Sequence, residues 1–212
     1  VLPMKNILVH GLGQNAQSWN RISEYLNKNA ITPLCPDLFS LLQNNEKDFS
    51  AFYHAICTYC LNQNDKLNLC GLSLGGVLSL EFAKQYPEKV NSLIIIGTPY
   101  QIPKALFKLQ GIIFHLMPKS IFLKMGCDKK TFINLVNSMG ALKTHEGLNK
   151  ITCDSLILCG IKDKANKKGA VSLNEHIKIS QLEFIENASH EINIENPDKL
   201  AEIILEFWKT KQ

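Results

Sequence analysis

Residues 67–76 read Leu-Asn-Leu-Cys-Gly-Leu-Ser-Leu-Gly-Gly, an apolar run that passes through Gly-x-Ser-x-Gly into a helical pattern ending at Gln85. This order predicts a buried strand, a sharp turn at the serine and then a helix. Gly71 and Gly75 suit the turn because a side chain at either position would collide with the neighbouring strand or helix. We therefore expect Ser73 to have a strained backbone and a hydroxyl exposed above the sheet.

The rest of the chain alternates short apolar runs with helical patterns. Such alternation predicts the α/β class, with a mostly parallel, doubly wound sheet of about six strands covered by helices on both faces. The last helix has Asn196 as its expected cap and Pro197 in its first turn. The predicted strands are 6–10, 32–35, 67–70, 92–96, 155–159 and 182–185, and the predicted helices are 19–28, 49–62, 77–85 and 197–209.

A serine hydroxyl is a weak nucleophile at neutral pH, so Ser73 needs a general base. In hydrolases with this turn, a carboxylate and then a histidine follow the serine along the chain. His190 follows a short apolar run and precedes the helix at 197–209, which predicts a loop at the carboxyl end of a strand. His145 and His176 lie in polar segments and are interpreted as solvated surface histidines. His190 is therefore the predicted base.

The carboxylate that would orient this base is predicted at Asp163. It follows the buried strand pattern 155–159, whereas Asp154 precedes that strand and would lie at the opposite edge of the sheet. Asp163 would accept the ring N–H of His190 and leave the other ring nitrogen free to take the Ser73 proton. An exposed turn aspartate among lysines is the alternative interpretation of Asp163.

A tetrahedral intermediate also needs two N–H donors, each worth about 3 kcal/mol when measured by deletion. The backbone N–H of Leu74, directly after the serine, is the first expected donor. The second is the N–H of Leu12, in the glycine-rich loop after the first central strand. His10 in the same region is expected to shape the loop rather than to take part in the reaction.

The stretch 10–19, His-Gly-Leu-Gly-Gln-Asn-Ala-Gln-Ser-Trp, and the turn 71–76 together resemble the α/β-hydrolase superfamily. Within it, the chain looks most like the pimeloyl-acyl-carrier-protein methyl ester esterases, the carboxylesterases of biotin synthesis. The resemblance implies a triad of Ser73, Asp163 and His190, an oxyanion hole at the two leucine amides, and no metal or cofactor. The segment 35–40 lacks the glycines usual in that family, and the short chain suggests missing early strands and a reduced lid.

Between residues 101 and 150 the alternation lapses and apolar-rich helical patterns replace it. We expect this segment to be a small helical lid on a core formed by 1–100 and 151–212. Most of its apolar side chains would pack the lid onto the core, and some would line an acyl slot, since substrate pockets are largely apolar. The expected substrate contacts are Leu12, Phe107, Phe114 and Phe122.

The same 101–150 segment is strongly basic. It holds eight lysines against one aspartate and one glutamate, a charge of +6 in a chain whose total is +4. Such a lid suits an acidic partner such as acyl carrier protein, or an anionic membrane surface. A composition with 22 lysines and one arginine, which scatters lysines over any exposed helix, is the alternative explanation. The chain lacks the aromatic-interleaved basic patch of nucleic-acid binders.

Composition sets the remaining bounds. The 212 residues are 45% hydrophobic and 20% charged, as expected of one globular domain with a small insertion. No apolar run reaches the roughly 18 residues of a membrane span. The N-terminus shows no signal segment, so we expect a cytoplasmic protein. The seven cysteines lie mostly in apolar stretches, as reduced core thiols would.

Three hypotheses follow. The first is a serine carboxylesterase that forms an acyl-enzyme on Ser73, with the methyl ester of a pimeloyl chain on acyl carrier protein as substrate. The second is a thioesterase or a general short-chain carboxylesterase that uses the same residues. The third is a non-catalytic, hydrolase-like binding protein, which a broken triad would indicate.

Overall fold

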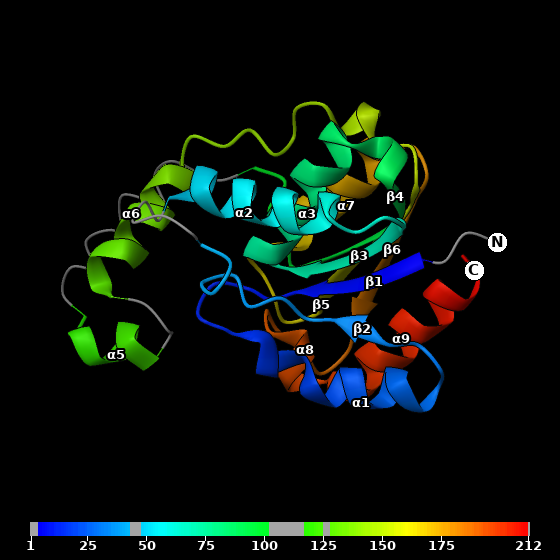
Figure 1. The fold of residues 1–212 in the computed structure, drawn as a ribbon, viewed down its shortest axis with the longest axis horizontal. Coiled ribbons are helices and arrows are strands. Elements are labelled where there is room, and N and C mark those ends of the chain that lie inside the picture. Colours follow the sequence, from blue (N-terminus) through cyan, green and yellow to red (C-terminus); the bar gives the residue numbers. More distant parts are fainter. Residues whose placement is uncertain (1–3, 43–47, 102–116, 125–127, 212) are drawn as a thin grey trace.

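The computed structural model describes residues 4–42, 48–101, 117–124 and 128–211. Its centre is a six-stranded sheet in the order β2-β1-β3-β4-β5-β6, in which every neighbouring pair is parallel (Figure 1). The predicted α/β class and its parallel sheet are therefore confirmed. The strands are β1 (Met4–Val9), β2 (Pro33–Leu34), β3 (Lys66–Leu72), β4 (Val90–Ile96), β5 (Asp154–Gly160) and β6 (Ser180–Ile185).

Helices cover both faces of this sheet (Figure 1). One face carries α1 (Asn20–Lys28), α8 (Ile192–Glu195) and α9 (Pro197–Lys209). The other carries α2 (Phe49–Leu61), α3 (Leu74–Gln85) and α7 (Lys167–His176). Short 3-10 turns occur at η1 (Ala16–Trp19), η2 (Pro87–Lys89) and η3 (Leu148–Lys150), and two further helices, α5 (Lys119–Lys124) and α6 (Lys129–Met139), lie at one end of the molecule.

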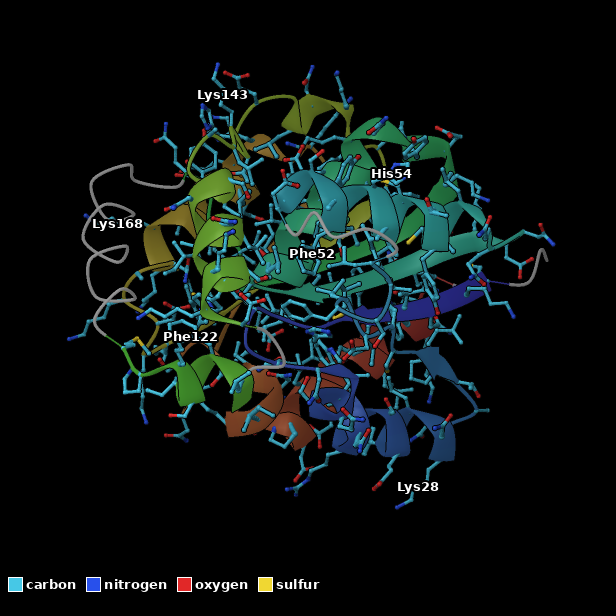
Figure 2. The ribbon with its side chains drawn as sticks, turned by 60° about the vertical axis from the view of Figure 1, so that its left-hand side comes forward. Lys28, Phe52, His54, Phe122, Lys143 and Lys168 are labelled. Atoms are coloured by element: carbon cyan, nitrogen blue, oxygen red, sulfur yellow. The ribbon has the colours of Figure 1, made fainter. Side chains whose placement is uncertain are left out.

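The central strands are apolar on both faces because helices bury both faces. In β4, Leu93 and Ile95 pack in the cluster that includes α2, α3 and α7, while Ile94 and Ile96 pack in the cluster that includes α1 and α9. Successive side chains of a strand point to opposite faces, so one continuous apolar run serves two cores. Figure 2 labels Phe52 of α2, which is fully buried in the first of these cores.

Several boundaries differ from the sequence-based prediction. The second strand has only two residues, and Pro33 cannot donate a hydrogen bond to a neighbouring strand. Helix α3 begins directly after Ser73, three residues earlier than predicted. Asn196 is the N-cap of α9 and Pro197 lies in its first turn, as predicted, but the Asn196 side chain makes no capping bond and its Nδ2 donates to the Glu186 carbonyl at 3.2 Å. The four-residue α8 was not predicted, because one turn is too short for a periodic pattern.

The described part of 101–150 is mainly helical. Phe122 of α5 is fully buried with Phe132 and Val136 of α6 in a small cluster, on which Leu12 and Phe39 also pack (Figure 2). Since Leu12 follows β1, this cluster lies over the carboxyl end of that strand. The division into core and lid stays a prediction.

Within the described ranges, no helix combines the length and apolar character needed to cross a lipid bilayer.

Candidate active site

Ser73 occupies the turn between β3 and α3 with φ +53° and ψ −111°, a positive φ that is costly for a residue with a side chain. Its backbone N–H donates to the Ile96 carbonyl at 2.8 Å, which fixes the turn against β4. A Cβ on Gly71 would collide with the Gly75 backbone, and a Cβ on Gly75 with the Val9 carbonyl. The two glycines therefore let the chain turn tightly enough to present the serine hydroxyl.

Three side chains from three strand-end loops meet at this turn. His190 Nε2 lies 3.0 Å from Ser73 Oγ, and His190 Nδ1 lies 2.8 Å from Asp163 Oδ2. Asp163 is 4% exposed and His190 is 40% exposed, so the carboxylate is shielded while the ring reaches the surface. The structure thus brings together the three residues that the sequence singled out, with the His190 ring between the serine hydroxyl and the carboxylate.

The electrostatics favour an ionised Asp163 and stabilise the protonated form that His190 adopts when it takes a proton. The hydrogen bond to Asp163 raises the pKa of His190 above its ordinary value, against the lowering effect of burial. Burial alone would raise the pKa of the Asp163 carboxyl, but hydrogen bonds from His190 and Asn166 outweigh burial and lower this pKa. An ionised Asp163 accepts from Nδ1–H, which leaves the Nε2 lone pair facing the Ser73 hydroxyl.

Asn166, which precedes α7, is a site residue that the sequence analysis missed. Its Nδ2 donates to Asp163 Oδ2 at 2.9 Å and lies 3.3 Å from His190 Nδ1, and its backbone N–H lies 3.2 Å from Asp163 Oδ1. These donors favour the ionised carboxylate and fix its plane. The i to i+3 spacing of an aspartate and an asparagine before a helix is the local signal that could have indicated it.

His10 shapes the loop after β1, as expected. It is fully buried, its Nδ1 donates to the Gly11 carbonyl at 2.9 Å, and its Nε2 accepts the backbone N–H of Leu38 at 3.0 Å. Burial lowers its pKa, which keeps the ring neutral and able to accept that bond. His10 therefore ties the loop after β1 to the segment after β2.

The two backbone amides predicted for the oxyanion hole belong to segments that border the serine. Leu74 is the first residue of α3, where a backbone N–H has no acceptor within the helix and carries the positive end of the helix dipole. On the other side, a Cβ on Gly11 would stand only 3.5 Å from the Ser73 Cβ, so the loop that carries Leu12 borders the nucleophile.

The remaining candidate acid and bases lie elsewhere. Asp154 begins β5 at the opposite edge of the sheet and pairs with Lys211 at 3.1 Å. His176 is exposed on α7, as predicted. The interpretation of His145 as a solvated histidine is wrong: it is half-buried, its ring centroid lies 5.6 Å from that of Tyr100, and its Nδ1 is shielded from solvent. Its neighbour Thr144, which donates to the Tyr100 carbonyl at 2.6 Å, holds the segment inward.

The substrate contacts predicted from sequence are only partly visible. Leu12 is half-buried and packs against both the main core and the cluster around Phe122. Phe107 and Phe114 lie outside the described residues. In the part of the chain that the structure describes, no group of three or more His, Cys, Asp or Glu side chains could hold a metal ion.

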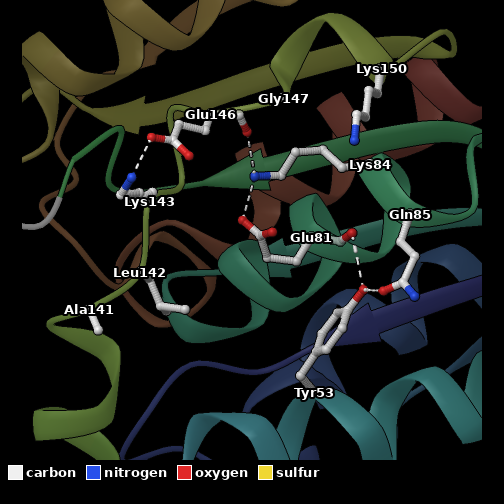
Figure 3. A pocket seen from close by; sticks show the side chains of 10 residues that line it. All are labelled: Tyr53, Glu81, Lys84, Gln85, Ala141, Leu142, Lys143, Glu146, Gly147 and Lys150. Atoms are coloured by element: carbon white, nitrogen blue, oxygen red, sulfur yellow. Dashed lines mark hydrogen bonds and ion pairs between the residues drawn. The ribbon is translucent and has the colours of Figure 1, made fainter.

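An open groove of about 750 Å³ lies away from this site, between α2, α3 and the segment before β5 (Figure 3). Lys84 lies in it, paired with Glu81 and donating to the Glu146 carbonyl at 3.0 Å. None of the three residues at the serine turn lines this groove. Its charged groups largely pair with one another and fasten the segment before β5 to α3.

Comparisons with known proteins agree with the geometry. The family model for the alpha/beta hydrolase fold matches residues 7–121, more than half of the chain. The chain belongs to this family, and its class is that of the hydrolases. It is 24% identical to the monoacylglycerol lipase ABHD6 of Mus musculus, over 95% of this chain and 74% of that protein.

Solved structures share the fold. The enol-lactonase from Burkholderia xenovorans LB400 superposes with a TM-score of 0.83 at 15% identity, covering 98% of this chain and 92% of that one. A thermophilic esterase from Thermogutta terrifontis superposes with a TM-score of 0.71 at 20% identity, covering 98% and 90% of the two chains.

Proposed function

We propose that this protein is a serine carboxylic ester hydrolase with Ser73 as nucleophile, His190 as general base and acid, and Asp163 as the carboxylate that orients the histidine. One observation carries the proposal: the continuous hydrogen-bond chain from Ser73 Oγ through the His190 ring to Asp163, built across three separate loops. A strained serine backbone at the head of a helix supports it, because such strain is expected at a functional turn.

The reaction would proceed through an acyl-enzyme. His190 Nε2 takes the Ser73 proton as Oγ bonds to the acyl carbonyl carbon, and the resulting oxyanion accepts the N–H groups of Leu12 and Leu74. Collapse of this intermediate breaks the ester C–O bond, and His190 returns the proton to the leaving oxygen. Water then attacks the acyl-enzyme with His190 again as base, releases the carboxylic acid and restores the serine hydroxyl.

The walls beside the serine turn favour an apolar acyl group. Leu12 and Phe39 pack on the cluster around Phe122, so aliphatic and aromatic surface adjoins the proposed oxyanion hole. The similarity to a monoacylglycerol lipase and an esterase supports an ester with an apolar acyl chain.

A pimeloyl methyl ester carried on acyl carrier protein is our specific substrate proposal. Exposed lysines on the described part of 101–150, Lys119, Lys130 and Lys150 among them, support an acidic carrier. The competing proposal is a thioesterase or short-chain esterase, and the structural likeness to the thioesterase domain of the curacin biosynthetic pathway favours keeping it.

Labelling with a fluorophosphonate tests the nucleophile. We expect the wild type to be labelled, Ser73→Ala to be unlabelled, and ester hydrolysis in that variant to fall by about 10⁶-fold. Ser50→Ala, an exposed serine on α2, is the matched control and should label normally. A folded wild-type protein that takes no label would favour a binding protein over an enzyme.

The substrate is tested with p-nitrophenyl esters of increasing length and with acyl-carrier-protein esters and thioesters, each assayed with wild type and Ser73→Ala. The biotin assignment expects the carrier-bound methyl ester to be the best substrate and the gene to rescue growth of an esterase-deficient strain without biotin. Faster turnover of thioesters would favour the thioesterase instead.

A further inference from the structure

The side chain of Glu195, the last residue of α8, forms hydrogen bonds with the backbone on both sides of the proposed base. One carboxylate oxygen accepts the N–H of Ser189 at 2.7 Å, and the other accepts the N–H of Glu191 at 3.0 Å. His190 lies between these two residues. Hydrogen bonds in which the acceptor is ionised are stronger than neutral ones, so a single side chain restrains the peptide that precedes Ser189 and the peptide that joins His190 to Glu191.

Other contacts also hold the loop around His190 to the rest of the described structure. On the side before the histidine, the Ala188 carbonyl accepts the Lys162 N–H at 3.0 Å, and Gly160 packs so closely on this loop that a Cβ there would collide with the Ser189 carbonyl. On the other side, Ile192 is fully buried. Between these anchors, the two bonds from Glu195 hold the backbone on either side of His190, and the Glu191 carbonyl accepts the backbone N–H groups of Ile194 and Glu195 at 2.9 Å.

We propose that Glu195 is a positioning residue for His190, holding the imidazole between Ser73 and Asp163 through the two backbone bonds. The proposal rests on the hydrolase function proposed above. It goes further by assigning a role to a carboxylate that touches neither the nucleophile nor the histidine ring.

The simpler account is that Glu195 only caps a short helix. Glu191 is the N-terminal cap of α8, and a carboxylate from the first turn that reaches back to the cap N–H is a common stabilising arrangement. That account predicts lost stability with unchanged chemistry per active site. The second bond, to Ser189 beyond the cap, is what a positioning role adds.

The charge of Glu195 also acts on the His190 ring. After the Asp163 hydrogen bond, the negative charges of Asp163, Glu191 and Glu195 contribute to the raised pKa of His190. Removing the Glu195 charge should therefore move the acid limb of the pH profile to lower pH. Both accounts share this shift, because the Glu195 charge acts on His190 through space, so kcat per titrated site is the measurement that separates them.

The experiment compares Glu195→Ala, which loses both bonds, with Glu195→Gln, which keeps one acceptor oxygen. Glu202→Gln is the matched control, since Glu202 is an exposed carboxylate on the neighbouring helix α9. Each protein is assayed with p-nitrophenyl butyrate across pH, and rates are normalised to sites titrated with a fluorophosphonate. Thermal unfolding is recorded in parallel.

We expect kcat per titrated site to fall about tenfold in Glu195→Ala and less in Glu195→Gln, since misplacing a catalytic group by 1 Å can cost about 100-fold. KM should stay within about twofold of the wild-type value, and the acid limb should move down in both variants. Wild-type kcat per titrated site in Glu195→Ala would overturn the proposal and leave a helix cap, wherever the acid limb lies. A wild-type protein that neither takes the fluorophosphonate label nor hydrolyses p-nitrophenyl butyrate would instead refute the proposed hydrolase function, whatever the variants do.

Discussion

At the scale of single residues, the site combines strained backbone conformations with a fully hydrogen-bonded carboxylate. Ser73 has a positive φ, and Asn187, which leads into the loop of His190, has φ +58°. Asparagine tolerates this conformation better than other residues with side chains, so the loop turns there at low cost. Asp163 by contrast is held by two partners, His190 and Asn166. The strained backbone of Ser73 thus exposes its hydroxyl, and hydrogen bonds fix the position of the Asp163 carboxylate.

Because hydrolysis needs neutral His190, activity should fall as pH falls through the pKa of its ring. The hydrogen bond to Asp163 raises this pKa, so the wild-type acid limb should have its midpoint above about 6.5, the ordinary histidine value. In Asp163→Asn the limb should move to lower pH and kcat should drop by about 10⁴-fold, since the wrong tautomer is favoured. The measurement is kcat/KM against pH.

Asp198→Asn serves as the control for that series. Asp198 is an exposed carboxylate on α9 that pairs with Arg21 at 2.6 Å. It should leave both the limb and kcat unchanged. An acid limb that stays in place in Asp163→Asn would contradict the assignment of Asp163 as partner of His190.

At the scale of elements, α8 fastens the loop of the base to the loop after β1. Asn193 of α8 is 2% exposed, and its Nδ2 donates to Gln14 Oε1 at 3.0 Å and to the Ser18 carbonyl at 3.3 Å. In return, Gln14 Nε2 donates to Asn193 Oδ1 at 3.2 Å and to Glu191 Oε1 at 2.9 Å. A reciprocal amide pair therefore joins the loop after β1 to α8, the helix that follows the loop of His190.

Removing this pair should destabilise the protein. In Asn193→Ala the Gln14 amide and the Ser18 carbonyl lose partners in a partly buried place, which costs about 1–3 kcal/mol of the free energy of unfolding. Urea denaturation checks the value. Asn27→Ala, at an exposed position on α1, should stay within about 0.5 kcal/mol of the wild type. Equal effects of the two substitutions would show that the amide pair contributes nothing specific.

At the scale of the whole molecule, the sheet separates two apolar cores. Ile56 of α2 packs in the core on one face, and Ile204 of α9 packs in the core on the other. Neither cluster includes the other isoleucine, so the two sites have no shared neighbours through which packing changes could couple.

This separation predicts additive stability effects. Ile56→Val and Ile204→Val should each cost about 0.5–1.5 kcal/mol of the free energy of unfolding. The double variant should cost their sum within about 0.5 kcal/mol, because distant sites without common partners behave independently. Chemical denaturation of the four proteins tests it, and a larger coupling energy would mean that the sheet transmits packing strain between its faces.

The sequence by itself determined the layered fold and the three residues at the serine turn. Alternating apolar and helical patterns are local properties, and a parallel sheet places every strand-end loop at one edge, so Ser73, Asp163 and His190 could each be assigned from the neighbouring residues. Only the tertiary structure showed that Asn166 bonds to Asp163 and that Glu195 bonds to the backbone beside His190, together with the short β2 and the one-turn α8. Side-chain orientations decide these hydrogen bonds, and a pattern of apolar and polar residues does not specify side-chain orientations.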